Sequence, residues 1–393
     1  MTSTLSNIGI AMQTKNKIQS IGNDDADIHV TDAPELFVNV SWDQVDPNVP
    51  AAYFWLPQWN FSSHQNLNTF DPPELTNDQI DYIRSSSNAV IIIWWPIESF
   101  TSGIVWDKLV EQIINLNLPR DKVHYVTGNL SSDIEPSEHC IIHSIDYFMF
   151  LTFKTHSMFD DYEPANTEKI KHWLYLNGND RDHRRYLLSY MEKYGLLDKS
   201  YWSFVWPEEK VFWPEWASDI TLQEYYHGQW EQKLLDQKQN EINLNGNQSI
   251  ISKEYVDNSC LSIVGETSFA GDMFNPGERK LYLTEKTYKT FAYYQPFILV
   301  GNCGALSYLR NQYGIETWPE IIDESYDLEE DPQRRMEIIC NEVDRLSQYS
   351  ASDLSDMISG YDDRLHRNAN LFKNNYELWY YENLRNILHA IFK

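Results

Sequence analysis

The stretch of this chain that decides its fold, residues 261–327, reads LSIVGETSFAGDMFNPGERKLYLTEKTYKTFAYYQPFILVGNCGALSYLRNQYGIETWPEIIDESYD. An apolar run at 261–264 ends in Gly265-Glu266, and a polar loop follows. A helix-like segment begins at 284–286, and a second apolar run covers 296–300. Strand, polar loop, helix and strand in this order are typical of a parallel α/β sheet. Such sheets place their ligand sites where strands end and helices begin, so we expect a binding site at these junctions.

Three features of this stretch also occur together in known enzymes. They are Glu266 at the end of a strand, a Thr-Glu-Lys triplet at the head of a helix (284–286), and Pro296 with Gly301 around the next strand. This pattern resembles the donor-binding half of fucosyltransferase-like and exostosin-like glycosyltransferases. It is most similar to glycosyltransferase-like proteins of phages and marine microbes, and the resemblance covers roughly residues 170–330.

The resemblance implies a nucleotide-sugar site in this part of the chain. In such enzymes the residue matching Glu266 contacts the donor, while a lysine matching Lys286 and a nearby arginine, here Arg279, contact its diphosphate. The family pattern has Asn-Ser after the first Glu where this chain has Thr267-Ser268. The identities of the sugar and of the nucleotide base in the donor therefore stay open. The predicted donor-binding residues are Asn177, Arg181, His183, Arg184, Glu266, Thr267, Ser268, Arg279, Thr284, Glu285 and Lys286.

Length and composition limit the classes of protein to which this chain can belong. The chain has 393 residues, 42% of them hydrophobic, which suffices for about two domains of ordinary size. Its net charge of −27 opposes nonspecific attraction to nucleic acid or anionic membranes. Its four scattered cysteines form no C-x-x-C pair, which argues against a disulfide framework or zinc ribbon. Neither a signal peptide nor a long apolar span is evident, so we expect a cytoplasmic protein, in the host cytoplasm if viral.

The order of apolar and polar segments predicts the α/β class, with two Rossmann-like domains facing a cleft, which is the GT-B architecture. Residues 1–34 are expected to form an irregular arm, and 35–160 an acceptor-side Rossmann-like domain. Residues 170–367 are expected to form the donor-binding domain, with an insertion at 206–250. A helix at 368–393 is expected to pack back on the first domain.

An Asp-x-Asp pattern, Asp180-Arg181-Asp182, raises the question of a metal. GT-A enzymes use such a motif to hold a divalent ion, whereas GT-B enzymes usually stabilise the diphosphate with cationic side chains and helix N-termini. Here the motif lies in a loop, 177–184, that directly follows an apolar strand and matches the resembling proteins. We therefore expect a loop that faces phosphate or sugar, no metal site, and no cofactor besides the nucleotide-sugar.

The general base is expected in the N-terminal domain. Glu98 follows the apolar strand 91–95, and carboxylates are suitable bases for inverting transfer. The alternative is that Glu98 lies in a solvent-exposed surface loop and has no catalytic role. Other candidates that the sequence leaves open are His124, Asp71, Glu74, His143 and His156.

These patterns favour a metal-independent, inverting glycosyltransferase that acts on a glycan, a lipid-linked sugar or a protein. A phage-type DNA-base glycosyltransferase is an alternative that the acidic charge disfavours. A second alternative is a non-catalytic binding or virion-structural protein built on a transferase fold that has lost its activity. Such a protein would bind a donor without hydrolysing it. A nucleotide-binding oxidoreductase fits poorly, because no G-x-G-x-x-G follows an early strand.

Overall fold

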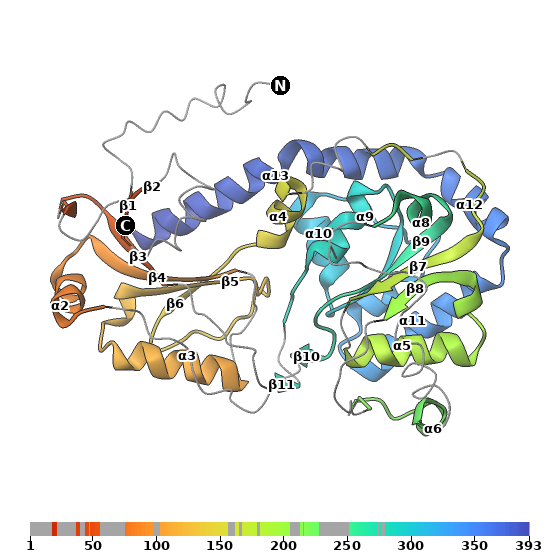
Figure 1. Cartoon of the computed structure of the whole chain (residues 1–393), viewed down its shortest axis with the longest axis horizontal. Helices are drawn as coiled ribbons and strands as arrows, with labels where there is room; N and C mark the ends of the chain where they lie inside the picture. Colours follow the sequence, from red (N-terminus) through yellow and green to blue (C-terminus); the bar gives the residue numbers. More distant parts are fainter. Residues whose placement is uncertain are drawn as a thin grey trace. The chain divides into compact units, whose positions relative to one another are not determined.

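The computed structural model describes residues 18–21, 37–39, 44–46, 48–55, 75–96, 103–155, 162–164, 167–178, 181–204, 213–214, 216–227, 251–272, 275–276 and 280–392. The chain divides into two compact units (Figure 1). The first unit consists of Met1–Asp146 together with Leu378–Lys393, and the second consists of Tyr147–Glu377. Each unit is built on its own parallel sheet.

The first unit contains a six-stranded sheet in which every pair of neighbours is parallel. Its central strands are continuous apolar runs because both faces of the sheet are covered, and the seven residues of Ala89–Trp95 are all buried. The strand order is β2 (Phe37–Asn39), β1 (Ile18–Ile21), β3 (Ala51–Trp55), β4 (Ala89–Trp95), β5 (Val123–Thr127) and β6 (Ile141–Ser144). The helices of its N-terminal part are α2 (Asn77–Ser85), α3 (Gly103–Asn115) and the 3-10 turn η5 (Arg120–Lys122).

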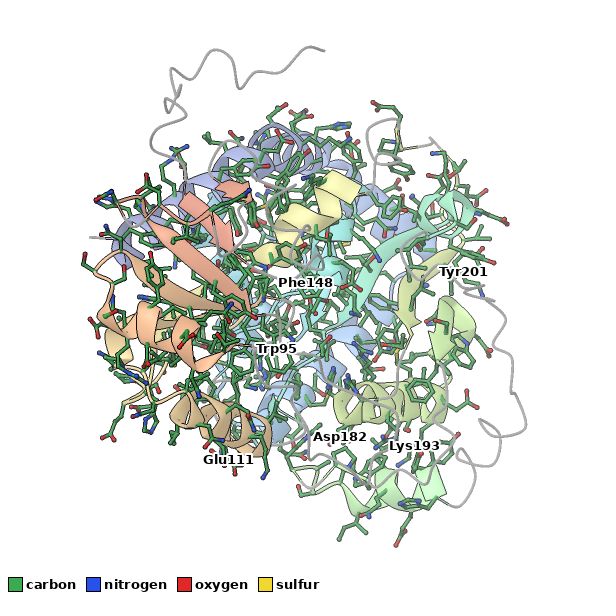
Figure 2. All side chains as sticks on the ribbon, turned by 60° about the vertical axis from the view of Figure 1, so that its left-hand side comes forward. Trp95, Glu111, Phe148, Asp182, Lys193 and Tyr201 are labelled. Carbon is green, nitrogen blue, oxygen red and sulfur yellow. The ribbon has the colours of Figure 1, made fainter. Side chains whose placement is uncertain are left out.

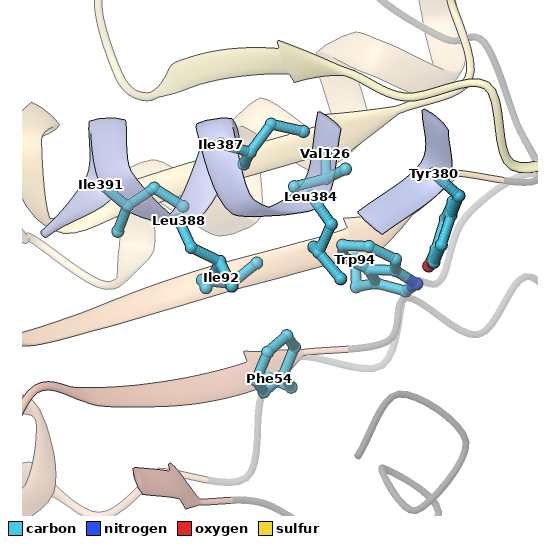
Figure 3. A pocket seen from close by; sticks show the side chains of 9 residues that line it. All are labelled: Phe54, Ile92, Trp94, Val126, Tyr380, Leu384, Ile387, Leu388 and Ile391. Carbon is cyan, nitrogen blue, oxygen red and sulfur yellow. The ribbon is translucent and has the colours of Figure 1, made fainter. Parts of the chain in front are cut away.

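The last helix, α13 (Asp362–Ile391), contributes residues to both units. In the first unit its apolar positions recur at the spacing of a helix face, and they oppose side chains of β3, β4 and β5 (Figure 3). A small apolar cavity of about 10 Å³ lies between the helix and the strands. The residues that line it are Tyr380, Leu384, Ile387, Leu388 and Ile391 of the helix and Phe54, Ile92, Trp94 and Val126 of the strands.

The second unit contains a four-stranded parallel sheet. Its strand order is β12 (Phe297–Val300), β9 (Ser259–Gly265), β7 (Lys171–Asn177) and β8 (Ser200–Phe204). Figure 1 shows α9 on one side of this sheet and α5 with α11 on the other. The chain runs from β7 outward to β8 and then returns to the opposite side of β7 as β9. The topological switch point therefore lies between β7 and β9, where open α/β sheets usually bind ligands.

In the second unit one helix begins at Asp182, shortly after β7 ends, and another begins at Ala305, shortly after β12 ends. Figure 2 shows Asp182 and Lys193, the first and last residues of α5. The helices are α4 (Tyr147–Thr155), α5 (Asp182–Lys193), α6 (Ile220–Tyr225), α8 (Lys253–Asp257), α9 (Glu285–Ala292), α10 (Ala305–Tyr313), α11 (Pro332–Ser347) and α12 (Ala351–Ser359). Shorter elements are η7 (Leu197–Lys199), η9 (Glu324–Leu328), and the antiparallel pair β10 (Gly271–Asp272) and β11 (Asn275–Pro276).

The expected α/β class with two Rossmann-like units is confirmed by the two parallel sheets. Two details differ from the sequence-based expectation. Residues 18–21, expected in an irregular arm, form β1 because they pair with both β2 and β3. The N-terminal part of the first unit ends at Asp146 rather than at 160. The reason is that α4 packs against α9 and against the first part of α13, for example through Phe153 and Phe372 with ring centroids 5.4 Å apart.

Candidate functional site

A pocket of about 100 Å³ lies at the switch point of the second unit. Gly178 follows β7 and Gly265 ends β9, and both line the pocket. One wall is formed by α9, which contributes Glu285, Lys286 and Lys289. The pocket therefore begins at the strand ends where the sequence predicted a binding site, and it extends along α9.

The Glu266 carboxylate is fully buried and binds the start of α9. Its Oε1 accepts hydrogen bonds from the Thr284 backbone N–H at 3.0 Å and from the Thr287 hydroxyl at 2.5 Å. Its Oε2 accepts from the Thr284 hydroxyl at 2.6 Å and from the Thr267 backbone N–H at 3.2 Å. The three contacts with Thr284 and Thr287 fix the first turn of α9 against the end of β9.

The backbone carbonyls at the end of β9 are bound by α5. The buried Arg184 donates from Nη2 to the carbonyls of Gly265 and Glu266, each at 2.8 Å. The buried His183 places Nε2 2.8 Å from the Glu266 carbonyl, and its ring stacks on Phe269 with centroids 5.3 Å apart. A carbonyl oxygen can only accept a hydrogen bond, so Nε2–H of His183 is the donor. This hydrogen bond to the backbone fixes the orientation of the His183 ring.

Gly265 is required because the end of β7 and helix α5 pack closely against it. A Cβ at this position would lie 2.8 Å from Asn177 Oδ1 and 3.1 Å from Arg184 Cγ. Both of those side chains are buried, so neither could move away easily. The structure thus places Asn177 and Arg184 side by side at Gly265.

Three of the remaining predicted residues, Lys286, Ser268 and Arg181, lie within the described part of the chain. The Lys286 ammonium lies 3.1 Å from Thr284 Oγ1 and 3.0 Å from Glu285 Oε1. The Ser268 hydroxyl accepts a 3.2 Å hydrogen bond from the Asn302 amide. Arg181 is the N-cap residue of α5. Glu98, Arg279 and Asp180 lie outside the described residues, as do the alternative bases Asp71, Glu74 and His156.

The electrostatics of the pocket are dominated by cations. Burial, and then the charge of Arg181, lowers the pKa of Arg184 to about 10. Burial also lowers the pKa of Lys289 to about 8, although Glu285 opposes this shift. Burial alone would raise the pKa of Glu285, but Lys286 and Lys289 lower it below its usual value. Three cationic side chains therefore line this pocket beside one ionised carboxylate.

Sequence reasoning missed Lys289. It lies three residues after Lys286, on the same face of α9, and it is only 4% exposed. Two lysines at this spacing usually lie on a helix face that is exposed to solvent. The burial of Lys289 depends on how α9 packs on the sheet, which the local sequence does not specify.

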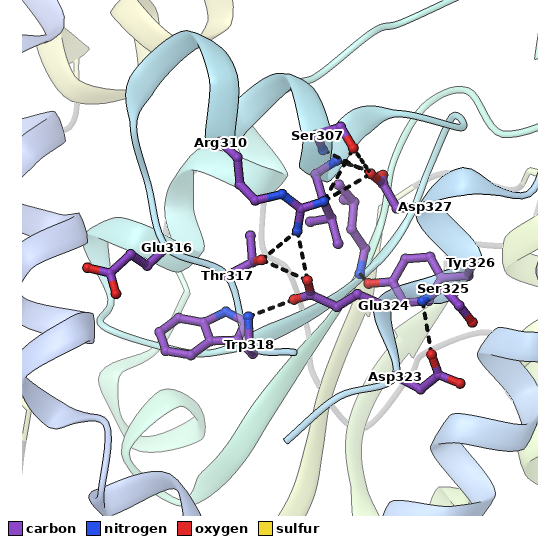
Figure 4. Close-up of polar contacts among 12 residues, drawn as sticks. Ser307, Arg310, Glu316, Thr317, Trp318, Asp323, Glu324, Ser325, Tyr326 and Asp327 are labelled. Carbon is purple, nitrogen blue, oxygen red and sulfur yellow. Dashed lines mark hydrogen bonds and ion pairs between the residues drawn. The ribbon is translucent and has the colours of Figure 1, made fainter. Parts of the chain in front are cut away.

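The segment Glu324–Asp327 forms a polar network around α10 (Figure 4). Asp327 Oδ1 accepts from the Leu306 backbone N–H at 2.7 Å, and its Oδ2 accepts from Ser307 N–H at 2.9 Å and from the Ser307 hydroxyl at 2.6 Å. Arg310 donates to Glu324 at 2.8 Å. Asp327 therefore occupies the N-terminus of α10, so this segment fixes α10 in place.

Two histidines proposed as alternative bases lie together in the first unit. His124 Nδ1 and His143 Nε2 are 3.1 Å apart, on neighbouring strands β5 and β6. Burial lowers the pKa of both rings to about 4, with the charge of His143 adding to the effect on His124. Within the described ranges, no group of three or more His, Cys, Asp or Glu residues could hold a metal ion.

No protein-family model matches this chain. No curated protein matches it either. A solved structure described as "OtsA apo structure" is similar with a TM-score of 0.38 and 8% sequence identity, covering 94% of this chain and 98% of that chain. Among the helices that the structure describes, none is long and apolar enough to cross a membrane.

Proposed function

We propose that this chain is a glycosyltransferase that moves a sugar from a nucleotide-sugar donor to an acceptor hydroxyl. The observation that supports this proposal is the group of cations Arg184, Lys286 and Lys289 in one pocket at the switch point of a parallel sheet. The chain as a whole has a net charge of −27, so the excess of positive charge in this pocket is opposite in sign to the charge of the chain. Its sequence resemblance to donor-binding halves of glycosyltransferases supports the same conclusion.

The chemistry of glycosyl transfer needs such a site. As the sugar leaves, negative charge develops on the nucleotide diphosphate, and fixed cations stabilise that charge without rearrangement. In this proposal Lys286 contacts the diphosphate, and Arg184 holds the end of β9 through the Gly265 carbonyl. Arg279 is proposed as a further diphosphate contact on the sequence resemblance alone.

The rest of the mechanism is proposed from the sequence. Transfer is inverting and metal-independent, and Glu98 of the first unit removes the proton of the acceptor hydroxyl. The acceptor is a glycan, a lipid-linked sugar or a protein. A DNA acceptor is disfavoured by the charge of the chain.

Donor binding is the direct test. Thermal unfolding is measured with UDP-, GDP-, ADP- and CMP-sugars, since saturation at about 100 times Kd stabilises a protein by roughly 2.7 kcal/mol. Lys286→Ala should weaken binding of the active donor by about 10- to 100-fold, because charge-assisted hydrogen bonds contribute about 1.5–3 kcal/mol. Lys108→Ala, which removes a lysine of α3 in the first unit, is the matched control and should bind normally.

Three outcomes decide between the candidate functions. Binding of a nucleotide-sugar with hydrolysis or transfer supports the proposal. Binding without any turnover would favour a non-catalytic binding protein on this fold. No binding of any of the four donor classes would overturn the proposal.

A further inference from the structure

The pocket along α9 has a far end beside the last turn of that helix. Ser262 lies three residues before Gly265 on β9, which is roughly 10 Å of extended strand. Leu174 is the neighbour of Ser262 on β7, and Gln295, which follows α9, binds the Ser262 hydroxyl. This far end of the pocket is lined by Leu174, Ile251, Ser262, Thr290, Tyr293 and Gln295.

The side-chain amide of Gln295 can take only one orientation. Its Nε2 lies 3.0 Å from the Val256 carbonyl oxygen, which cannot donate a hydrogen bond. Nε2 also lies 3.0 Å from Ser259 Oγ, whose own hydrogen is donated to the Tyr255 carbonyl at 2.7 Å. Both amide hydrogens are therefore donated within the protein, and the amide oxygen Oε1 faces Ser262.

The hydroxyl groups of Ser262 and Thr290 have no hydrogen left for a ligand. Ser262 Oγ lies 2.5 Å from Gln295 Oε1 and must donate its hydrogen to that oxygen. Thr290 donates its hydroxyl hydrogen to the Thr287 carbonyl at 2.7 Å. Ser262, Thr290 and Gln295 are each more than nine-tenths buried, and all line the pocket. Their side chains offer only lone pairs, so a ligand group that binds them must donate hydrogen bonds.

We propose that the far end binds the base of the donor nucleotide and selects a base with an exocyclic amino group, which is adenine, guanine or cytosine. This inference rests on the proposed function, in which the cations of the pocket meet the diphosphate. An amino group brings two N–H donors to oxygen atoms that can only accept. Uracil has a single N–H between two carbonyl groups, and its carbonyl oxygens would face the lone pairs of Ser262 and Thr290 without a hydrogen bond.

The walls of the far end fit the rest of a base. Leu174 and Ile251 line it with apolar side chains, and Tyr293 contributes from the end of α9. Apolar side chains with a few fixed polar groups are the usual lining of sites for flat organic ligands. The apolar walls would contact the faces of the ring, while the oxygen atoms of Ser262 and Thr290 select its edge.

Nucleoside diphosphates without a sugar test this selection directly. CDP and UDP differ only at positions 3 and 4 of the ring, where cytosine has the amino group and uracil a carbonyl. ADP and GDP are compared with IDP, which lacks the amino group. Calorimetry with the full chain should show at least one amino-bearing diphosphate binding about tenfold or more tightly than its counterpart. Equal binding of UDP and CDP, and of IDP, ADP and GDP, would overturn the inference.

Variants at the far end show whether its oxygen atoms cause the preference. Ser262→Ala removes one acceptor and Thr290→Val removes the other, and each should lower the preference by about 3- to 10-fold. Ser200→Ala is the matched control, because Ser200 is a buried serine of β8 whose hydroxyl donates to the Leu196 carbonyl at 3.0 Å. An unchanged preference in Thr290→Val, which keeps the shape of the side chain, would contradict the inference even if Ser262→Ala does not fold.

The inference and the proposed function fail in different ways. If amino-bearing diphosphates are preferred but no nucleotide-sugar is turned over, the proposed function fails and the base site stands. If the chain transfers sugar from a UDP-sugar as well as from the amino-bearing donors, base selection is refuted and the transferase stands. Absence of binding for all five diphosphates would refute the base site, whatever the outcome of the transfer assay.

Discussion

The Glu266 carboxylate accepts two hydrogen bonds from Thr284, one from the backbone N–H at 3.0 Å and one from the hydroxyl at 2.6 Å. This pair joins the end of β9 to the start of α9. Since α9 carries Lys286 and Lys289, Glu266 determines where the cations of the pocket lie. Glu266 thus positions the site, and its direct contact with a donor stays a prediction.

Replacing Glu266 with glutamine should destabilise the second unit. The amide would point an N–H₂ group at donors that now meet a carboxylate, and hydrogen bonds to charged groups contribute about 1.5–3 kcal/mol each. We expect a loss of roughly 2–4 kcal/mol, measured as a lower thermal midpoint. Glu285→Gln, which keeps the Glu266 contacts, is the matched control and should cost less. Equal stability of Glu266→Gln and the wild type would contradict this account.

A second stability prediction concerns Asp327. Its buried carboxylate accepts from two backbone N–H groups of α10 and from a hydroxyl, so Asp327→Asn should cost about 1–3 kcal/mol. Asp323 makes a cap of the same kind in an exposed position, accepting from the Ser325 N–H at 3.0 Å. Urea unfolding should show a clearly smaller loss for Asp323→Asn. If Asp327→Asn and Asp323→Asn lower the free energy of unfolding by the same amount, burial of Asp327 does not explain the loss of stability.

The paired rings of His124 and His143 predict an acid-sensitive first unit. Burial lowers the pKa of both to about 4 in the folded protein, whereas the ordinary value is about 6.5. Below pH 6.5 the unfolded chain therefore binds protons that the folded chain does not, and stability falls as the pH drops toward 4. Unfolding midpoints between pH 7.5 and pH 4.5 measure this loss, and His143→Gln should flatten the curve. An unchanged slope in that variant would rule out the pair as the cause.

We predict that activity survives metal removal. Arg184, Lys286 and Lys289 place positive charge where another enzyme class would hold a divalent ion. Turnover should be the same, within about twofold, before and after EDTA treatment. Complete loss in EDTA with recovery on adding manganese would revive Asp180 and Asp182 as metal ligands.

Glu98→Gln tests the proposed base. This substitution keeps the shape of the side chain and removes its basicity, so donor affinity should be retained while turnover falls by roughly 10²–10⁴-fold. Glu111→Gln, on α3 of the same unit, serves as a control that should keep full turnover. Normal turnover in Glu98→Gln would leave Asp71, Glu74, His124, His143 and His156 to be tested in the same way.

The parallel sheet of the second unit could be predicted from the sequence because buried strands are continuous apolar runs. Residues 261–264 and 296–300 have this character, and glycine marks the end of each strand. The start of α9 was also visible, since Thr284 precedes a polar first turn. β1 was not, because a four-residue strand gains its stability from two neighbours rather than from its own pattern.

The role of individual site residues was harder to predict than the place of the site. A glutamate at a strand end has the same sequence context whether it contacts a ligand or, as Glu266 does here, the start of a helix. Lys289 resembles a surface lysine until the packing of α9 buries it. Both facts depend on contacts between elements that lie far apart in the sequence.

The division of α13 between the two units affects the order of folding during synthesis. Residues 147–377 are continuous, so the second unit is complete once Glu377 has left the ribosome. The first unit lacks the helix face that covers Ile92 and Trp94 until residues 378–391 emerge. Every residue of the second unit is therefore synthesised before the first unit has its last helix turns. Until its last helix turns arrive, the nascent first unit presents an open apolar sheet, which is the type of surface that chaperones bind.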